Sequence, residues 1–332
     1  MPTFCRHNRL VQNCPICARE QDVELRPIVT GPRAAPVRSA SASAPTGGAR
    51  PGSAGARAAR PSPGVTVRRL RRHADDGYRS ELVPGLKSSD DAGRLAQEIA
   101  FAVGRLETLR TDPPGLYASV AEPLGDIEER SWLAFQIAYL GPLDGEHPFA
   151  AIEQGATTWS SGRVPAADEL ELGPRSSHRP GGGTRTLDAY RAWAQRAGSQ
   201  AAALTGEPSW TPERRFARAF ERLALPGLQR GAKFDLLVTL CWLGVYEMRA
   251  GSLFFGGDDE VTLAAKRLLG IGDAMLLDRR AAALAQTCGL PLEALDVGFY
   301  NWERGERALL GMDPSAEADP AALDSAETAL GL

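Results

Sequence analysis

The apolar residues of this chain recur at helical spacing over its last two thirds. Leu95, Ile99, Val103 and Leu106 follow one another every three to four positions, which places them on one face of an α-helix. Residues 127–140 are apolar on most sides, as expected of a helix at the centre of a core. The same reasoning predicts a short helix from Phe149 and longer ones at 187–204, 212–223, 232–243, 261–269, 274–285 and 292–302.

No segment alternates apolar and polar residues over a useful length, so we predict an all-α body of about eight to ten helices and no strands. We expect the body to begin near Ser89 with a helix N-cap, followed by Asp90 and Asp91 in the first turn. A loop at 161–186 interrupts it with prolines and Gly181-Gly182-Gly183. A loop of this length inside a compact domain is either functional or disordered.

Two of the predicted helices are joined by Gly270-Ile271-Gly272-Asp273. Helix, Gly-x-Gly turn, helix is the pattern of a helix-hairpin-helix. Such hairpins bind the DNA backbone because the glycines, here Gly270 and Gly272, bring main-chain N–H groups and a helix N-terminus against a phosphate. The alternative is an ordinary corner between two packed helices.

Charge is unevenly distributed along the chain. Residues 1–73 hold 13 Arg and 3 acids, a balance of +10, whereas the remaining residues hold 25 Lys+Arg and 38 Asp+Glu, a balance of −13. A polyanion is therefore expected to meet the N-terminal arm, and the body needs local positive features if it binds nucleic acid. The arm ends in a basic cluster of four residues, Arg68, Arg69, Arg71 and Arg72. This cluster is either a non-specific phosphate contact or a solvated patch.

The first 17 residues contain a C-x-H pair followed by a C-x-x-C pair. Cys5, His7, Cys14 and Cys17 suit tetrahedral zinc, and the C-x-x-C half grips the ion through one tight turn. With all four positions filled by protein the site would be structural, and zinc would supply much of the folding free energy of this short segment. The alternative is an unstructured tail with incidental cysteines.

Composition divides the chain into four predicted regions. Residues 33–66 are almost entirely Ala, Pro, Ser, Gly and Arg, so they cannot bury enough surface to offset their conformational entropy. We predict a zinc knuckle at 1–24, a disordered basic linker at 25–88, a helical domain at 89–312 and an acidic tail at 313–332 with at most one weak helix.

Cysteine usage and hydropathy predict a compartment. Cys241 and Cys288 lie inside apolar helical patterns, where small buried thiols are common. This distribution favours a reducing cytosol over a disulfide framework. The sequence has no run of apolar residues long enough to span a membrane and begins without a secretory signal, so we expect a cytoplasmic protein. The oligomeric state stays open.

An all-helical body with a Gly-x-Gly hairpin near its end and an aspartate soon after resembles the helix-hairpin-helix DNA glycosylases. In that family the aspartate stabilises positive charge developing at a deoxyribose or activates a nucleophile, and Asp296, 24 residues after Gly272, matches it. The lysine of the bifunctional members is replaced by Ala274, so the resemblance does not imply lyase chemistry. Leu295-Asp296-Val297-Gly298 stands where that family has Val-Asp-Thr-His, which sets the chain apart from ordinary base excision.

The chain more closely resembles the bacterial α-glutamyl/putrescinyl thymine pyrophosphorylases, helical proteins distantly similar to those glycosylases. The resemblance rests on the knuckle from Phe4 to Cys17, on Arg230-Gly231-Ala232-Lys233-Phe234-Asp235, and on the stretch from Ala265 to Asp273. It implies attachment of an amino donor to a pyrophosphorylated hydroxymethyluracil in DNA, with release of pyrophosphate.

Release of pyrophosphate needs cations on the leaving group. Lys233, Lys266 and Arg267 are basic residues inside otherwise apolar segments and, with Asp296, are the catalytic candidates. The alternative for each cation is a side chain that reaches from a helix face to solvent. Asp235 and Asp273 are each a candidate base or a helix cap. Tyr300 and Trp302 either stack on a flipped base or pack in the core. His147 is a candidate for proton transfer.

Two functions from different classes follow. The first is an enzyme that acts on a modified thymine or uracil in DNA. The second is a non-catalytic helical adaptor that docks nucleic acid or a partner protein through the knuckle and the basic arm. Convergence of Lys233, Lys266, Arg267 and Asp296 around one pocket would favour the enzyme.

Overall fold

A computed structural model describes residues 73–332 of the chain. This part is helical and contains no strand, which confirms the all-α prediction. Its elements are α2 (Ser89–Thr111), α3 (Leu116–Ala121), α4 (Ile127–Leu140), α5 (Ala150–Gly155), the 3-10 helix η2 (Ala167–Glu169), α6 (Arg185–Arg196), α7 (Gln200–Thr205), α8 (Pro212–Arg222), α9 (Arg230–Trp242), α10 (Glu260–Leu269), α11 (Ala274–Cys288), α12 (Ala294–Arg304) and α13 (Pro320–Leu330).

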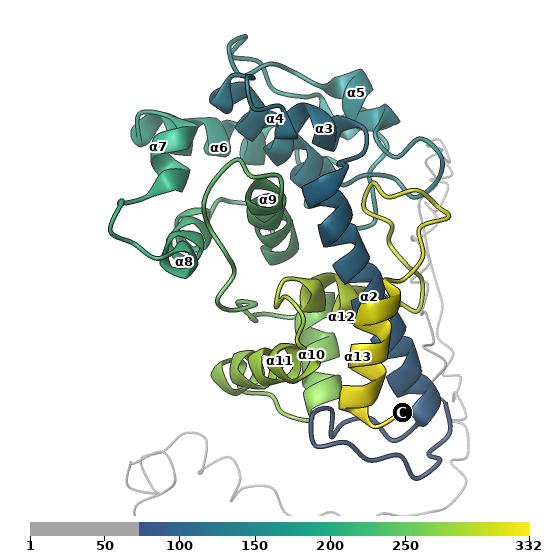
Figure 1. Cartoon of the computed structure of the whole chain (residues 1–332). Helices are drawn as coiled ribbons and strands as arrows, with labels where there is room; N and C mark the ends of the chain where they lie inside the picture. Colours follow the sequence, from purple (N-terminus) through teal and green to yellow (C-terminus); the bar gives the residue numbers. More distant parts are fainter. Residues whose placement is uncertain (1–72) are drawn as a thin grey trace, which may run out of the picture. The chain divides into compact units, whose positions relative to one another are not determined.

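The longest helix, α2, is the element on which the C-terminal helices pack (Figure 1). Its most extensive contacts are with α12 and α13. The approach of α12 depends on Gly298, because a Cβ at that position would lie 2.9 Å from Cγ1 of Ile99 on α2. A larger residue at position 298 would therefore push the two helices apart.

The helices from α3 to α9 gather at the other end of α2 (Figure 1). The helix α4 packs on α9, and its aromatic side chains stack on α6. The ring of Tyr190 lies 3.7 Å from the ring of Phe135 and 5.8 Å from that of Trp132, centroid to centroid. All three side chains are buried, so this aromatic stack fixes the packing of α6 on α4.

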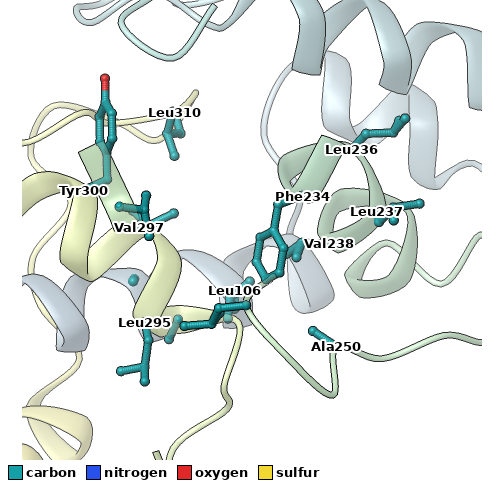
Figure 2. Close-up of a cluster of buried hydrophobic side chains, with 14 of the residues drawn as sticks. Leu106, Phe234, Leu236, Leu237, Val238, Ala250, Leu295, Val297, Tyr300 and Leu310 are labelled. Carbon is teal, nitrogen blue, oxygen red and sulfur yellow. The ribbon is translucent and has the colours of Figure 1, made fainter. Parts of the chain in front are cut away.

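The core continues between the two groups of helices. Figure 2 shows Phe234 and Val238 of α9 directed toward Leu106 of α2 and toward Leu295 and Val297 of α12. These five side chains are all buried. The same faces of α9 and α12 also carry charged residues, and this apolar packing surrounds them.

The start of the helical domain differs in detail from the sequence prediction. Ser89 does not cap α2 with its side chain; Asp76 accepts hydrogen bonds from the main-chain N–H of Ser89 (2.8 Å) and from its hydroxyl (2.5 Å). Among residues 73–88, which fell within the predicted linker, Val83 and Leu86 are buried. The N–H of Gly85 donates to the carbonyl of Leu268 at the end of α10 (2.9 Å). Ordered packing therefore begins before α2.

The helix count also exceeds the prediction. Residues 73–332 contain twelve α-helices, partly because the helix expected at 187–204 is divided into α6 and α7. Gly198 adopts a φ of 94° between them, and the Ser199 side chain caps α7 by accepting from the N–H of Ala202 (3.0 Å). A glycine in left-handed conformation followed by a capping serine is a strong stop and restart signal.

The segment after Met312 is packed against the body. α13 lies on α2 and α11, and Ala322, Ala326 and Leu330 are buried. Asp319 caps it through the N–H of Ala322 (2.7 Å). None of the helices in residues 73–332 has the length and apolar character needed to cross a membrane.

Candidate functional site

Asp296 lies at the centre of a buried ionic network. The side chain projects from the first turn of α12 and has no exposed surface. Arg175 donates from Nη2 to its Oδ2 (2.6 Å), and Arg230 donates from Nη2 to its Oδ1. Both carboxylate oxygens are therefore occupied by guanidinium groups in a region otherwise made of apolar side chains.

Arg175 comes from the long loop that the sequence marked as functional or disordered. We call residues 156–184, which contain no α-helix, the strap. Arg175 also forms a two-point ion pair with Asp235 of α9, Nε to Oδ2 at 2.7 Å and Nη2 to Oδ1 at 3.1 Å. Its guanidinium carbon lies 4.5 Å from the ring centroid of Tyr300, whose hydroxyl donates to the carbonyl of Pro174 (2.6 Å). The strap thus connects α9 with α12.

The strap is held in place on both sides of Arg175. The N–H of Gly173 donates to the carbonyl of Leu140 (3.1 Å), and the N–H of Ser177 donates to that of Tyr139 (2.9 Å), both at the end of α4. The ring of His178 lies between the Tyr139 hydroxyl (Nδ1, 2.8 Å) and a carboxylate oxygen of Asp168 (Nε2, 2.8 Å). These contacts define the position from which Arg175 enters the site.

Arg230 links the site to α10. It is the first residue of α9, and its Nε donates to Asp259 Oδ1 (3.2 Å) while its Nη1 donates to the carbonyl of Leu253 (2.9 Å). Asp259 is the N-cap of α10 and accepts from the N–H of Thr262 (3.2 Å). The helix that ends at the Gly-x-Gly turn therefore begins at the ionic network.

Burial and charge act in opposite directions on these groups. Burial raises the pKa of Asp296 above its ordinary value, although Arg230 and Arg175 act to lower it. Burial also opposes the charge on Arg175, but Asp235 and Asp296 together raise the pKa of this guanidinium. For Asp259, the Arg230 guanidinium and hydrogen bonds from Thr262 outweigh burial and lower the pKa. A buried acid with a raised pKa among cations is typical of functional sites and also occurs in structural ion networks.

The site contains polar atoms without partners. In the described part of the chain, Nη1 of Arg175 and Nε of Arg105 are buried and have no hydrogen-bond partner. Both side chains border the same narrow cavity, together with Asp235 and Tyr117. Unpaired buried donors are costly, so this cavity is the part of the network with unused hydrogen-bonding capacity.

The three cations expected beside Asp296 lie elsewhere. Lys233 places its ammonium 4.2 Å from the ring centroid of Phe220, and burial and Arg230 lower its pKa. Arg267 forms an ion pair with Glu303 of α12. Lys266 is half-buried near the end of α10. In the described residues no hydrogen bond or ion pair joins any of the three to Asp296; Arg175 and Arg230 occupy that role.

The turn between α10 and α11 is exposed. Gly270 ends α10 in the left-handed conformation (φ 68°), and Gly272 has no atom within 4 Å of the position that a Cβ would take. Asp273 acts as the N-cap of α11, accepting from the N–H of Leu276 (3.0 Å). At the start of α11, Met275 is 80% exposed and Leu276 46% exposed. The chain thus forms two helices around an accessible Gly-x-Gly turn.

The remaining candidates divide between core and surface. Trp302 is buried and donates from Nε1 to the carbonyl of Asp91 (3.1 Å), whereas Tyr300 contacts Arg175. His147 is exposed and lines an open pocket of about 390 Å³ beside Glu146 and Phe149. This pocket is lined by other residues than the ionic network. Cys288 is buried and Cys241 half-buried, and burial raises the thiol pKa to about 11 and about 12 respectively.

The proposed zinc ligands and the basic cluster lie outside the described residues. This applies to Cys5, His7, Cys14, Cys17 and the run Arg68, Arg69, Arg71 and Arg72. The structural zinc ion and the DNA contact of the arm stay predictions.

Sequence reasoning missed Arg175 and Arg230 as partners of Asp296. Arg230 stood inside the quoted motif Arg230–Asp235, and its position at the start of a helix was the available signal. Arg175 follows Pro174 in a loop without any local pattern, so only the fold reveals its contact. Comparisons with family models, with curated proteins and with solved structures found no match to this chain.

Proposed function

We propose that this protein binds DNA and acts on a modified thymine or uracil base, attaching an amino donor with release of pyrophosphate. The observation that carries the proposal is the buried carboxylate of Asp296 held between two arginines. In this reaction the amine nitrogen forms a bond to the methylene carbon on the base, the bond from that carbon to the pyrophosphate oxygen breaks, and the amine loses a proton. A carboxylate whose pKa is raised suits the proton acceptor, and guanidinium groups suit the leaving pyrophosphate.

The network and the Gly-x-Gly turn lie at opposite ends of α10. α10 has ten residues, and at 1.5 Å per residue it extends about 15 Å from its cap at Asp259 to the turn at Gly270. A nucleotide flipped from a DNA backbone held at the turn would have to extend along α10 to reach the network. Because Asp296 is fully buried, the reaction also requires the strap to move and admit the base.

The direct test is a reaction with defined DNA. We expect the full chain to release pyrophosphate from a duplex containing one pyrophosphorylated hydroxymethyluracil when glutamate or putrescine is supplied. The nucleoside should gain the mass of the amine, and the same duplex with thymine should give neither product. If the chain binds this DNA but releases no pyrophosphate with either glutamate or putrescine, the enzymatic function is rejected.

The alternative function is a non-catalytic adaptor for DNA or a partner protein. The specific observation in its favour is that both oxygens of Asp296 are occupied and the side chain is closed off from solvent. An adaptor would bind DNA and release no pyrophosphate, so the same reaction distinguishes the two functions.

The hairpin contact is tested by Gly272→Ala. A Cβ at position 272 meets no atom within 4 Å, so we expect the melting temperature to stay unchanged. If the turn approaches a phosphate closely, the added methyl group should weaken binding to duplex DNA several-fold, since loss of one or two hydrogen bonds to phosphate costs about 1–2 kcal/mol. Fluorescence anisotropy with labelled duplex measures this, and equal affinity of variant and wild type would make the turn an ordinary corner.

A further inference from the structure

The exposed face of α8 carries a row of arginines. Arg214, Arg218 and Arg222 are spaced by four residues and are all exposed. Residues four apart lie on neighbouring turns of the same helix face, while Phe216 and Phe220 on the opposite side are buried. We name the three arginines and the adjacent Trp210 the α8 basic face. It stands out because residues 74–332 have a net charge of −13.

Trp210 organises two of these cations. The guanidinium carbon of Arg214 lies 5.1 Å from its ring centroid, and that of Arg222 lies 5.8 Å from it. A guanidinium held against an aromatic ring keeps its N–H groups in a defined orientation and free to donate to phosphate oxygens. The ring therefore limits the side-chain entropy that these arginines would lose on binding an anion.

The basic face is largely without carboxylate partners. In the described part of the chain, the side chains of Arg214 and Arg222 form no ion pair or hydrogen bond, whereas Arg218 pairs with Glu221 at 2.8 Å. That pair is exposed, with 50% and 57% of its side chains accessible, so it is weak and a phosphate can replace the glutamate. Two free cations and one weakly paired one remain for a polyanion.

The spacing of the arginines fits a nucleic-acid backbone. From Arg214 to Arg222 the helix rises about 12 Å, at 1.5 Å per residue. One strand of duplex DNA carries a phosphate about every 3.4 Å along its axis, so the row spans roughly three to four phosphates.

The helix α8 is connected to α11 through two consecutive residues. Phe254 stacks on Phe220 of α8 with ring centroids 4.2 Å apart, and the N–H of Leu253 donates to Asp278 of α11 (2.9 Å). Leu253 also accepts from Arg230 of the ionic network. The helix α8, the network and α11 are therefore joined by direct contacts, which reach α8 on the side opposite the basic face.

We propose that the α8 basic face is a second contact surface for the backbone of duplex DNA, in addition to the hairpin. The proposal rests on the proposed function only in taking DNA as the partner. This surface gives a helical body of net negative charge a sequence-independent contact to the DNA backbone. An acidic protein and an anionic membrane are the competing partners for such a surface, and the test includes both.

The test compares two full-length variants with the same change in net charge. One carries Arg214→Gln, Arg218→Gln and Arg222→Gln. The control carries Arg79→Gln, Arg110→Gln and Arg196→Gln, three arginines that are also exposed but lie outside α8. Affinity for a labelled duplex is measured by anisotropy over a range of salt concentrations, and circular dichroism melting verifies the fold of both variants.

We expect the α8 variant to bind duplex DNA roughly 10- to 100-fold more weakly than wild type at low salt, with its log affinity–log salt slope reduced by about two to three, since each lost phosphate contact removes about 0.9. The control substitutions should change both the affinity and the salt slope far less. Equal losses in the two variants, or no loss in the α8 variant, would overturn the assignment of this surface, whereas absence of DNA binding by wild type would reject the proposed function itself. Wild-type binding to polyglutamate or phosphatidylserine vesicles that depends on α8, with DNA affinity unaffected, would also overturn the DNA proposal.

Discussion

Replacing Asp296 with asparagine is expected to lower the free energy of unfolding by about 2–4 kcal/mol. The amide keeps the shape of the side chain but removes the charge between Arg175 and Arg230, both of which are buried. Each guanidinium then loses one charged acceptor and keeps another, Asp235 for Arg175 and Asp259 for Arg230, so one buried donor group on each is left without a charged partner. The amide also presents N–H donors where only acceptors fit.

The change is measured by urea unfolding of wild type and variant. Asp324→Asn on α13 is the control, because Asp324 is exposed and its replacement should cost less than about 0.5 kcal/mol. The double variant Arg175→Met, Asp296→Asn should lose less than the sum of the single changes, since the two residues interact directly. If Asp296→Asn is as stable as wild type, the network is not a structural element, and loss of pyrophosphate release alone would then assign the residue to chemistry.

Replacing Gly173 with alanine is expected to cost about 2–4 kcal/mol, because the strap lies too close to the end of α4 for a side chain. A Cβ at position 173 would lie 2.1 Å from the carbonyl oxygen of Pro142 and 2.6 Å from that of Gly141. Both are main-chain atoms and cannot rotate away. The strap must shift, the hydrogen bond from Gly173 to Leu140 is lost, and Arg175, two residues further on, moves relative to its partners.

Gly93→Ala supplies a matched control for this substitution. Gly93 lies within α2, and a Cβ there meets no atom within 4 Å, so alanine should stabilise the helix by up to about 1 kcal/mol. Urea unfolding of the two variants separates a general effect of losing a glycine from the close contact at the strap. Gly173→Ala with wild-type stability would show that the strap tolerates displacement with little loss.

Helices were predictable from local information. Residues 127–140 are apolar on most sides and a proline follows them at position 142, and this predicted range agrees with α4. The start of α8 was predictable because Thr211 caps it and Pro212 occupies its first turn. The cap of α2 was not predictable in this way, since Asp76 stands 13 residues upstream of Ser89 and reaches it only through the packing of residues 73–88.

The ionic network shows which part of the candidate site could not be predicted from the sequence. Asp296 was identified from its distance to the hairpin, but its partners at positions 175 and 230 are 121 and 66 residues away. The chain has 35 arginines, and composition does not distinguish a buried arginine from the many exposed ones. Lys233, Lys266 and Arg267 were selected for their apolar surroundings, yet long side chains can leave such surroundings for solvent or, as in Arg267, for a carboxylate on the neighbouring helix α12.

The packing of α2 also has a consequence for the synthesis of this protein. α2 ends at Thr111, whereas its main partner α12 begins at Ala294, so the ribosome must add roughly 180 residues before the two helices can meet. At about 5–20 residues per second this takes on the order of 10–40 s. During that interval the apolar face of the nascent helix has neither α12 nor α13 to cover it, and a chaperone that binds emerging chains has both the time and the surface to act there.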